Sequence, residues 1–215
     1  MKRERKRRDI KKIIIDISRD LFITNGYTVT TIRQITEKAE INIGSLYHFF
    51  RDKEDILLHI VIDAYRDFMQ ASRSIVGKEM NPVLQYSVIN ALELKAVEKY
   101  DRIAEFYLVV YNSWRITELM LSYNIQRNRL FFHKYNETFN DQDYYMRTLA
   151  LRGIRLSFIA ERVNQGVVNF DMKCPFTIEM GLSLFNVPER TIKATINKTM
   201  MIINEKSIMI YGFNI

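Results

Sequence analysis

This sequence predicts an all-helical protein, because of its composition and the spacing of its apolar residues. Its 215 residues include only 7 Gly and 3 Pro, so few positions interrupt a long helix. Apolar residues recur every three or four positions in most segments, as they do in helices that bury one face. A hydrophobic content of 47% suffices for a core without a disulfide or a metal. We expect about ten helices.

The first two helices are predicted from apolar faces and from end signals. The first helix carries one apolar face: Ile10, Ile13, Ile14, Ile17 and Leu21. Asn25 and Gly26 stop it, because glycine tolerates the left-handed conformation at a helix end. Thr31 and Gln34 form a capping box, in which each side chain bonds to the other residue's backbone N–H. The second helix that follows has three inward residues: Ile32, Ile35 and Ala39.

The third helix is predicted to be short. Asn42 is a good N-cap for it. Ile41 and Leu46, before and after that cap, are spaced as a hydrophobic staple that fixes the angle at which the chain enters the helix. We expect the helix to end within residues 47–50.

The fourth helix is expected at residues 52–74. Asp52 caps it, and Glu54 and Asp55 lie in its first turn, where the helix dipole favours acidic side chains. Its buried face is predicted from a regular apolar stripe: Leu57, Ile60, Val61, Ala64 and Phe68.

The second and third helices form the pattern of a helix-turn-helix, a motif that places its second helix in the major groove of DNA. A longer set of residues carries a closer resemblance: Leu21-Phe22, Asn25-Gly26-Tyr27, Thr30-Thr31, Ile35, Ala39, Gly44, Leu46-Tyr47-His48-Phe49-Phe50 and Lys53-Glu54. Through them, residues 9–57 resemble the N-terminal domain of the TetR family of transcription regulators. Glu40 departs from that family, which usually has glycine at this corner. If the corner needs a positive φ, glutamate costs on the order of 1 kcal/mol there.

The resemblance implies that the third helix reads duplex DNA. Eight residues are candidates for contacts with bases or phosphates: Thr31, Arg33, Asn42, Gly44, Ser45, Tyr47, His48 and Lys53. Gly44 lets a phosphate approach closely, and Lys53 adds positive charge at the start of a helix. The alternative is an ordinary solvated face, with Thr31 and Arg33 serving in capping and surface solubility.

A basic segment opens the chain. Residues 1–12 contain eight Lys or Arg and two acidic residues, and so hold most of the net charge of +7. Such a segment attracts polyanions, either nucleic acid or anionic lipid. We expect it to raise the affinity for phosphate without sequence preference, with tracking of the minor groove as the alternative.

A second helical region follows. Asn81 and Pro82 open a helix that extends to about Lys99. Asp101 is predicted to cap the next helix, whose apolar residues are Ile103, Phe106, Tyr107, Val110, Trp114, Thr117 and Leu121. The remaining elements are a helix with Phe131, Phe132, Tyr135 and Phe139, a helix at 142–165 ended by Gly166, a connector at 170–177 around Pro175, and helices at 178–185 and 188–205. The tail from Ser207 is unassigned.

The resemblance implies a pocket for a small-molecule effector in this second region. Its candidate lining residues are aromatic or flexible: Tyr65, Phe68, Met69, Phe106, Tyr107, Tyr111, Trp114, Phe131 and Phe132. The polar candidates for orienting a ligand are Glu105, Asn112, Arg115 and Glu118. The alternative is plain packing for the aromatic stripes and a surface position for the polar residues.

The resemblance also implies a homodimer that pairs through the last long helices, at 142–165 and 188–205. Gly153 is unusual inside a helix. It marks either a close crossing of two helices or a place where crowding within one subunit is relieved.

Catalysis has little support in this sequence. His48, His59 and His133 lack the spacing of metal ligands, and Cys174 has no base nearby in the chain. A glycine-rich phosphate loop and a nucleophile elbow are both missing, so we expect no enzyme activity, metal or cofactor. A single cysteine and the lack of a long apolar stretch favour a cytoplasmic protein that does not span a membrane.

The sequence therefore predicts a DNA-binding domain at residues 1–50 and a ligand-binding and dimerisation domain at 51–215, joined by the helix at 52–74. The implied function is regulation of transcription, most often repression. In this function the protein binds a palindromic operator, and a small molecule releases the protein from it. The alternative is a ligand-independent or architectural DNA-binding factor controlled by a protein partner. A third possibility is a helical module on anionic membranes that uses only the basic segment.

Overall fold

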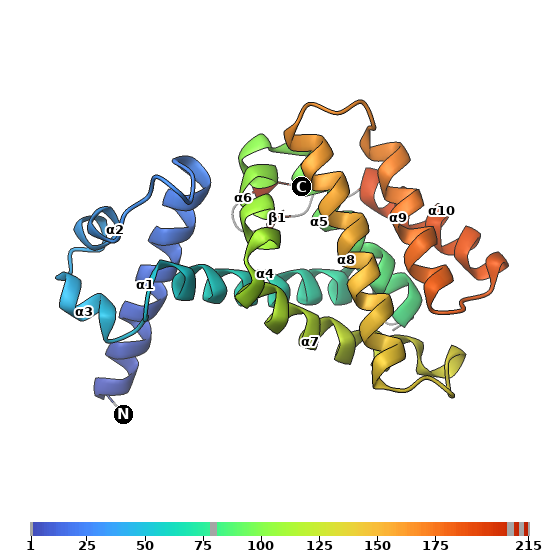
Figure 1. Ribbon diagram of the computed structural model, residues 1–215, viewed down its shortest axis with the longest axis horizontal. Helices are drawn as coiled ribbons and strands as arrows, with labels where there is room; N and C mark the ends of the chain where they lie inside the picture. Colours follow the sequence, from blue (N-terminus) through green and yellow to red (C-terminus); the bar gives the residue numbers. More distant parts are fainter. Residues whose placement is uncertain (1, 78–80, 206–208, 211–212, 215) are drawn as a thin grey trace. The chain divides into compact units, whose positions relative to one another are not determined.

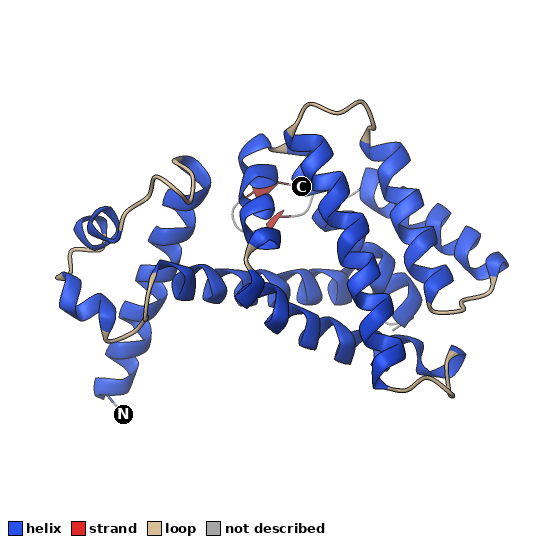
Figure 2. Cartoon of the chain, viewed as in Figure 1, coloured by secondary structure: helices blue, strands red, loops and turns tan. Residues whose placement is uncertain are grey.

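The computed structural model describes residues 2–77, 81–205, 209–210 and 213–214, with side chains for 7–77 and 81–205. Within these ranges the chain forms ten α-helices, which confirms the all-helical class (Figure 2). The unassigned tail contains a hairpin of two very short antiparallel strands, β1 (Met209–Ile210) and β2 (Phe213–Asn214). The chain divides into two compact units, residues 1–65 and 66–215, which are described here separately.

The first unit contains three helices and the start of a fourth: α1 (Lys2–Thr24), α2 (Ile32–Lys38), α3 (Ile43–Tyr47) and α4 (Lys53–Val76). Its core is apolar and consists of Ile14, Phe22, Ile35, Leu46, Phe50, Ile56 and Ile60. Since α2 and α3 are too short to be stable alone, their packing against this core holds them in place.

Three predicted helix caps in the first unit are confirmed. The Thr31 hydroxyl accepts from the Gln34 N–H at 3.2 Å, and the Gln34 side chain accepts from the Thr31 N–H at 2.8 Å. At α3 the Asn42 side chain accepts from the Ser45 N–H at 2.7 Å. At α4 the Asp52 carboxylate accepts from the Asp55 N–H at 2.6 Å. These bonds satisfy backbone groups that have no partner inside the helix.

The first helix differs from its prediction in length and in buried face. It begins at Lys2, so the basic segment is helical and continuous with the rest of α1. The buried face is formed by Ile14, Ser18 and Phe22, whereas Ile13 is 48% exposed. A buried serine in the stripe broke the apolar pattern, and the expected face was therefore rotated to include Ile13.

The second unit contains the rest of α4 and six more helices: α5 (Pro82–Lys99), α6 (Asp101–Asn112), α7 (Trp114–Phe132), α8 (Asp141–Val163), α9 (Phe170–Leu184) and α10 (Glu189–Glu205). A short 3-10 turn, η2 (His133–Tyr135), follows α7. Helix α5 is central, because it contacts each helix from α6 to α10. It is accordingly buried on nearly all sides, as a helix that is apolar all round must be. Helices α9 and α10 lie side by side (Figure 1).

The helix predicted from Asp101 through Leu121 is in fact two helices. Ser113 ends α6 and caps α7, because its side chain accepts from the Ile116 N–H at 3.2 Å. Asp101 is the first helical residue, and the capping position before it is Tyr100, which makes no side-chain cap. Apolar spacing that continued across Ser113 concealed the break.

The connector predicted at residues 170–177 is also wrong, since these residues form the first half of α9. Asn169 caps this helix through the Met172 N–H at 3.1 Å. Pro175 lies inside the helix, where it lacks one backbone donor. The neighbouring Cys174 and Ile178 are fully buried, so packing offsets that loss.

Candidate functional site

Helix α3 presents an uncharged surface to solvent. Of its residues only Leu46 is buried, while Ile43, Gly44 and Tyr47 are exposed and Ser45 is half-buried. His48 directly after the helix is exposed as well. Residues 41–50 contain no Lys, Arg, Asp or Glu. Any contact that this segment makes with a partner must therefore come from hydroxyl, amide, imidazole and apolar groups.

Some of the polar side chains around α3 already form helix caps. The Asn42 side-chain oxygen is occupied by the Ser45 N–H, and the Thr31 hydroxyl takes part in the capping box of α2. Arg33 forms an exposed ion pair with Glu37 at 2.8 Å, which solvent makes weak. Among these predicted contact residues, Arg33, Tyr47 and His48 retain exposed side chains whose polar groups do not serve as helix caps.

The turn before α3 has the geometry suspected from the sequence. Glu40 has a φ of 53°, in the left-handed region that favours glycine. The Ile41 N–H donates to the Thr36 carbonyl at 3.0 Å across this turn. The turn therefore keeps its hydrogen bond although its corner residue is a glutamate.

Lys53 has a role that the sequence did not predict. Its ammonium donates to the backbone carbonyls of Tyr27 at 2.8 Å, Thr30 at 2.9 Å and Thr28 at 3.3 Å. It also lies 4.4 Å from the centre of the Tyr27 ring. Burial lowers the pKa of this ammonium. All three N–H groups have internal acceptors, so Lys53 ties α4 to the loop before α2, and its contact with a phosphate stays a prediction.

The basic start of α1 lies against the segment that follows α3. The Arg7 guanidinium is 5.7 Å from the centre of the Phe49 ring, and the Lys11 ammonium is 5.4 Å from that of Phe50. Lys11 also bonds to the His59 ring of α4 at 2.8 Å. The side chains of residues 2–6, which carry much of the predicted basic segment, are outside the described residues.

The predicted effector residues occupy different environments. Phe68 and Phe131 are buried, and Tyr65, Met69, Phe106, Tyr107 and Tyr111 are half-buried. Phe132 is part of an aromatic core, where it stacks on Phe185 at 4.7 Å. Trp114 is 66% exposed at the first position of α7, so its assignment to an interior stripe is wrong. The turn at Ser113 causes this difference, because it moves Trp114 out of the stripe of α6.

The polar candidates Glu105, Asn112 and Glu118 are exposed. Glu105 pairs with Arg102 at 2.8 Å, and the Asn112 side chain donates to the Leu108 carbonyl at 2.8 Å within its own helix. For these three residues the structure agrees with the surface alternative.

A polar cluster inside the second unit was not predicted. The Arg155 guanidinium of α8 pairs with Glu93 of α5 at 3.1 Å and donates to Asn90. Burial opposes its charge, but the neighbouring Glu93 and Tyr111 raise the pKa of Arg155, so it stays protonated. Arg152 donates to the Thr117 hydroxyl at 2.8 Å and lies 5.5 Å from the centre of the Tyr111 ring. Tyr111, a predicted pocket residue, thus lies beside two guanidinium groups.

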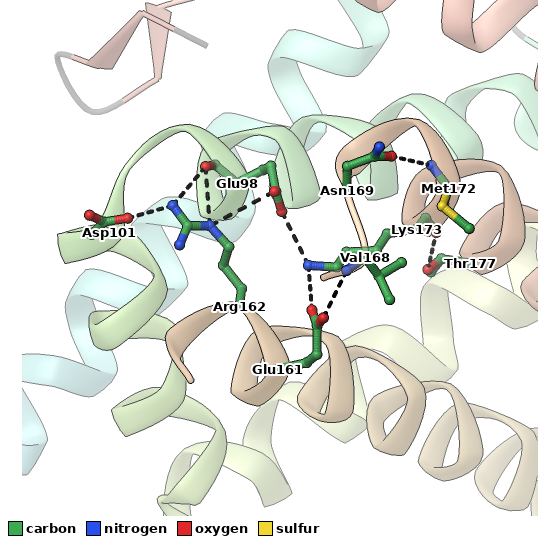
Figure 3. A network of polar contacts seen from close by, with 9 residues as sticks. All are labelled: Glu98, Asp101, Glu161, Arg162, Val168, Asn169, Met172, Lys173 and Thr177. Carbon is green, nitrogen blue, oxygen red and sulfur yellow. Dashed lines mark hydrogen bonds and ion pairs between the residues drawn. The ribbon is translucent and has the colours of Figure 1, made fainter. Parts of the chain in front are cut away.

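A second ion-pair network joins α5, α6, α8 and α9 (Figure 3). At its centre is Lys173, which is only 3% exposed and pairs with Glu161 at 2.7 Å and Glu98 at 3.3 Å. Glu161 also accepts from the Val168 N–H at 2.9 Å. The hydrogen bond from Lys173, followed by that from Val168, lowers the pKa of the Glu161 carboxyl. Arg162 extends the network to Asp101.

The one cysteine is unsuited to nucleophilic chemistry. Cys174 is fully buried, and burial together with the nearby Asp171 raises the pKa of its thiol to about 12. Within the described residues, no group of three His, Cys, Asp or Glu side chains could hold a metal ion. None of the described helices has the length and hydropathy needed to cross a membrane.

Comparison with known proteins identifies the first unit. Residues 14–60, which run from α1 through the helix-turn-helix into α4, match the family described as bacterial regulatory proteins, tetR family. The N-terminal domain of this chain belongs to the TetR family. Its resemblance to TetR domains was already apparent in residues 9–57, and the match covers nearly the same segment.

Two TetR-type relatives extend the similarity past this domain. The chain is 31% identical over 116 residues to the HTH-type transcriptional regulator QacR of Staphylococcus aureus, covering 52% of this chain and 61% of QacR. It is 35% identical over 88 residues to the HTH-type transcriptional repressor KstR2 of Rhodococcus jostii, covering 41% of this chain and 42% of KstR2. The matched part therefore spans less than two thirds of either relative.

The whole fold resembles solved TetR-like structures. RolR in complex with resorcinol superposes with a TM-score of 0.69, covering 90% of this chain and 96% of RolR. The sequence identity over this superposition is 19%, so the likeness concerns the fold alone.

Proposed function

We propose that this protein is a homodimeric transcription regulator of the TetR type, which binds a pseudo-palindromic operator through α3 and is released from DNA by a small molecule. The observation that carries the proposal is the capped helix-turn-helix of α2 and α3 within the segment that matches the TetR family. The similarity to QacR and KstR2, which are regulators of transcription, supports it. Repression is proposed by analogy with KstR2.

The DNA contacts are proposed at α3 and at the start of α2. Tyr47 and His48 project from α3 with exposed side chains, and Gly44 lets the backbone approach a phosphate. Thr31 and Arg33 lie at the N-terminus of α2, whose free amides favour an anion. Asn42 and Ser45 support α3 through its cap.

The dimer is proposed to form through the exposed face of α8. This face is apolar or small and consists of Tyr145, Met146, Leu149, Ala150, Gly153 and Ser157. A Cβ built on Gly153 would meet no atom within 4 Å. Gly153 therefore relieves no crowding within the subunit, which favours the other prediction, a close crossing with a second copy.

The other long helices contribute less clearly to such an interface. Met201 is exposed on α10, the second helix predicted to pair. Met172 and Phe176 are exposed on α9, and Phe176 makes an edge-to-face contact with Phe158 of α8 at 6.0 Å. We propose α8 as the main dimer element, with α9 or α10 beside it.

The effector is proposed to bind in the second unit near Tyr107 and Tyr111 of α6, whose rings stack at 6.4 Å. Both side chains are half-buried, and Arg152 beside Tyr111 can donate to a polar group. RolR, which has the same fold, is solved with resorcinol, so a small aromatic compound is a reasonable first probe. Helix α4 contributes residues to both units and is the proposed route of coupling.

Operator binding is tested by selecting duplexes from a random library and measuring affinity for the selected sequence. Tyr47→Ala should weaken binding without changing the melting temperature, because Tyr47 is exposed on α3. Trp114→Ala, which removes an exposed aromatic residue from the second unit, is the matched control and should bind normally. Failure to select any duplex would overturn the proposal.

The dimer and the effector need separate tests. Leu149→Glu should give a folded monomer in sedimentation velocity, whereas Leu130→Glu, at an exposed leucine on α7, should stay dimeric. Resorcinol and a panel of aromatic and cationic compounds are screened by thermal shift. A hit should weaken operator binding, and the operator should weaken the hit by the same factor. If a hit binds tightly and operator affinity does not change, the ligand-independent alternative is favoured.

A further inference from the structure

The exposed part of α3 lacks the side chains that read most bases by hydrogen bonding. In the major groove, Arg or Lys reads guanine, Asn or Gln reads adenine, and Asp or Glu reads cytosine. Residues 41–50 contain no charged side chain, so this segment lacks the usual partners of guanine and cytosine. The Asn42 side chain, the usual partner type for adenine, is already engaged in the cap of α3, where its oxygen accepts from the Ser45 N–H.

A large aliphatic side chain is exposed at the start of the same helix. Ile43 is the first residue of α3 and is 47% exposed. Tyr47, four positions later, lies beside it on the helix and is also exposed. Together they form an exposed apolar strip on the helix proposed to enter the major groove.

Thymine differs from the other bases in the major groove by an apolar group, its C5-methyl. We propose that Ile43 reads thymine, by packing its exposed side chain on the C5-methyl group of one thymine in each half-site. This inference rests on the proposed function, and it adds the chemical class of the base that α3 selects. The apolar contact removes the methyl group and the isoleucine from water and needs no hydrogen bond.

Replacement of thymine by uracil tests this contact, because uracil lacks the methyl group and keeps the same base pairing. Each thymine of the selected operator is replaced in turn, symmetrically in both half-sites, and affinity is measured with wild type, Ile43→Ala and Ile13→Ala. Ile13 is a matched control, since it is the same residue type in the same unit and is 48% exposed, but on α1.

The wild type should bind about fourfold more weakly for each methyl group lost, the factor that corresponds to one buried methyl or methylene, and therefore about 16-fold more weakly for a symmetric pair. Ile43→Ala should bind the normal operator more weakly and should show no further loss with uracil at that position. Ile13→Ala should keep the wild-type response, and Ile43→Val should be intermediate. Circular dichroism should show all variants folded, since neither isoleucine is in the core.

Two results overturn the inference. If each uracil replacement lowers the operator affinity of Ile43→Ala by the same factor as that of the wild type, Ile43 does not contact the methyl group. If no thymine replacement weakens the wild type, no methyl group is read. Both results require a selected operator, so they are distinct from failure of the proposed function, in which no duplex is selected and both proposals fall.

Discussion

The two units of this protein use their charged side chains in different ways. In the first unit the core is mainly apolar, and the Lys53 ammonium bonds to backbone carbonyls. In the second unit ion pairs cross between helices, as Lys173 does between α5, α8 and α9. The comparison teaches that Lys53 holds a loop in place in the first unit, whereas the Lys173 network joins separate helices in the second.

Leu46→Ala should produce the largest effect and should break the first unit alone. Leu46 is fully buried under α3, so the cavity should cost about 2–5 kcal/mol. Hydrogen exchange should rise in α1 to α3 and stay unchanged in α5 to α10. Equal protection in α1 to α3 of variant and wild type would contradict the burial of Leu46.

Lys173→Ala should destabilise the second unit by about 2–4 kcal/mol, because it leaves two carboxylates facing a buried gap. This cost is lower than for a fully buried pair, because water reaches the Glu98 and Glu161 side chains, which are 28% and 26% exposed. Lys193→Ala is the control, because it removes only a fully exposed pair with Glu189 and should leave the unfolding midpoint almost unchanged. Urea unfolding of both variants measures the difference, and equal midpoints would contradict it.

Lys53→Ala should cost about 1–3 kcal/mol, because it leaves the carbonyls of the loop before α2 without their charged donor. Operator affinity should fall along with stability. Arg33→Ala, at an exposed residue of α2, should reduce affinity with no change in the melting temperature. If Lys53→Ala is as stable as the wild type but binds DNA weakly, the result would support a direct contact between Lys53 and a phosphate.

The Lys173 network should also make the second unit acid-sensitive. The pKa of Glu161 is lowered from 4.5 on folding, so its contribution is complete above that pH and is lost as pH falls through the folded value. The effect should be smaller than that of Lys173→Ala, since Glu98 keeps its ion pair. Urea midpoints at several acidic pH values should depend less on pH in Glu161→Gln than in wild type.

Glu40→Gly should give the smallest change and should be stabilising, by about 1 kcal/mol, because glycine adopts the φ of 53° without strain. Asn186→Gly in the second unit starts from the same φ of 53°, but it also removes the Asn186 side chain that donates to Asn136 at 2.8 Å. Asparagine tolerates this conformation better than glutamate, so its replacement should gain less. Thermal melts compare the rise in melting temperature of the two variants, and a larger rise for Asn186→Gly would contradict the prediction.

Sequence reasoning succeeded where the decisive signal was local. The caps at Thr31, Asn42 and Asp52 each bond to a residue three positions later, so a short pattern contains the whole interaction. The positive φ at Glu40 was foreseen from the family's usual glycine. Residues 9–57 were therefore well predicted in fold, and their DNA contacts stay a prediction.

Sequence reasoning failed where long-range packing decided the outcome. Residues 170–177 were taken for a connector because of Pro175, although burial of Lys173 and Cys174 holds them in α9. The Arg155 cluster and the Lys173 network join residues whose separation in the chain gives no periodic signal. The internal role of Lys53 was missed for a related reason, because its acceptors are carbonyl groups, which no side-chain pattern reveals.

The uncharged character of residues 41–50 separates two properties of DNA binding that usually change together. Affinity for phosphate falls steeply as ionic strength rises. The reason is that counterions released from the DNA gain less entropy when the surrounding salt is more concentrated. The base contacts proposed for Ile43, Tyr47 and His48 would involve no ion pair with phosphate and would release no counterion. The preference for the operator over other DNA should therefore stay nearly constant from low to high salt while the absolute affinity falls, so that added salt makes binding weaker but no less selective.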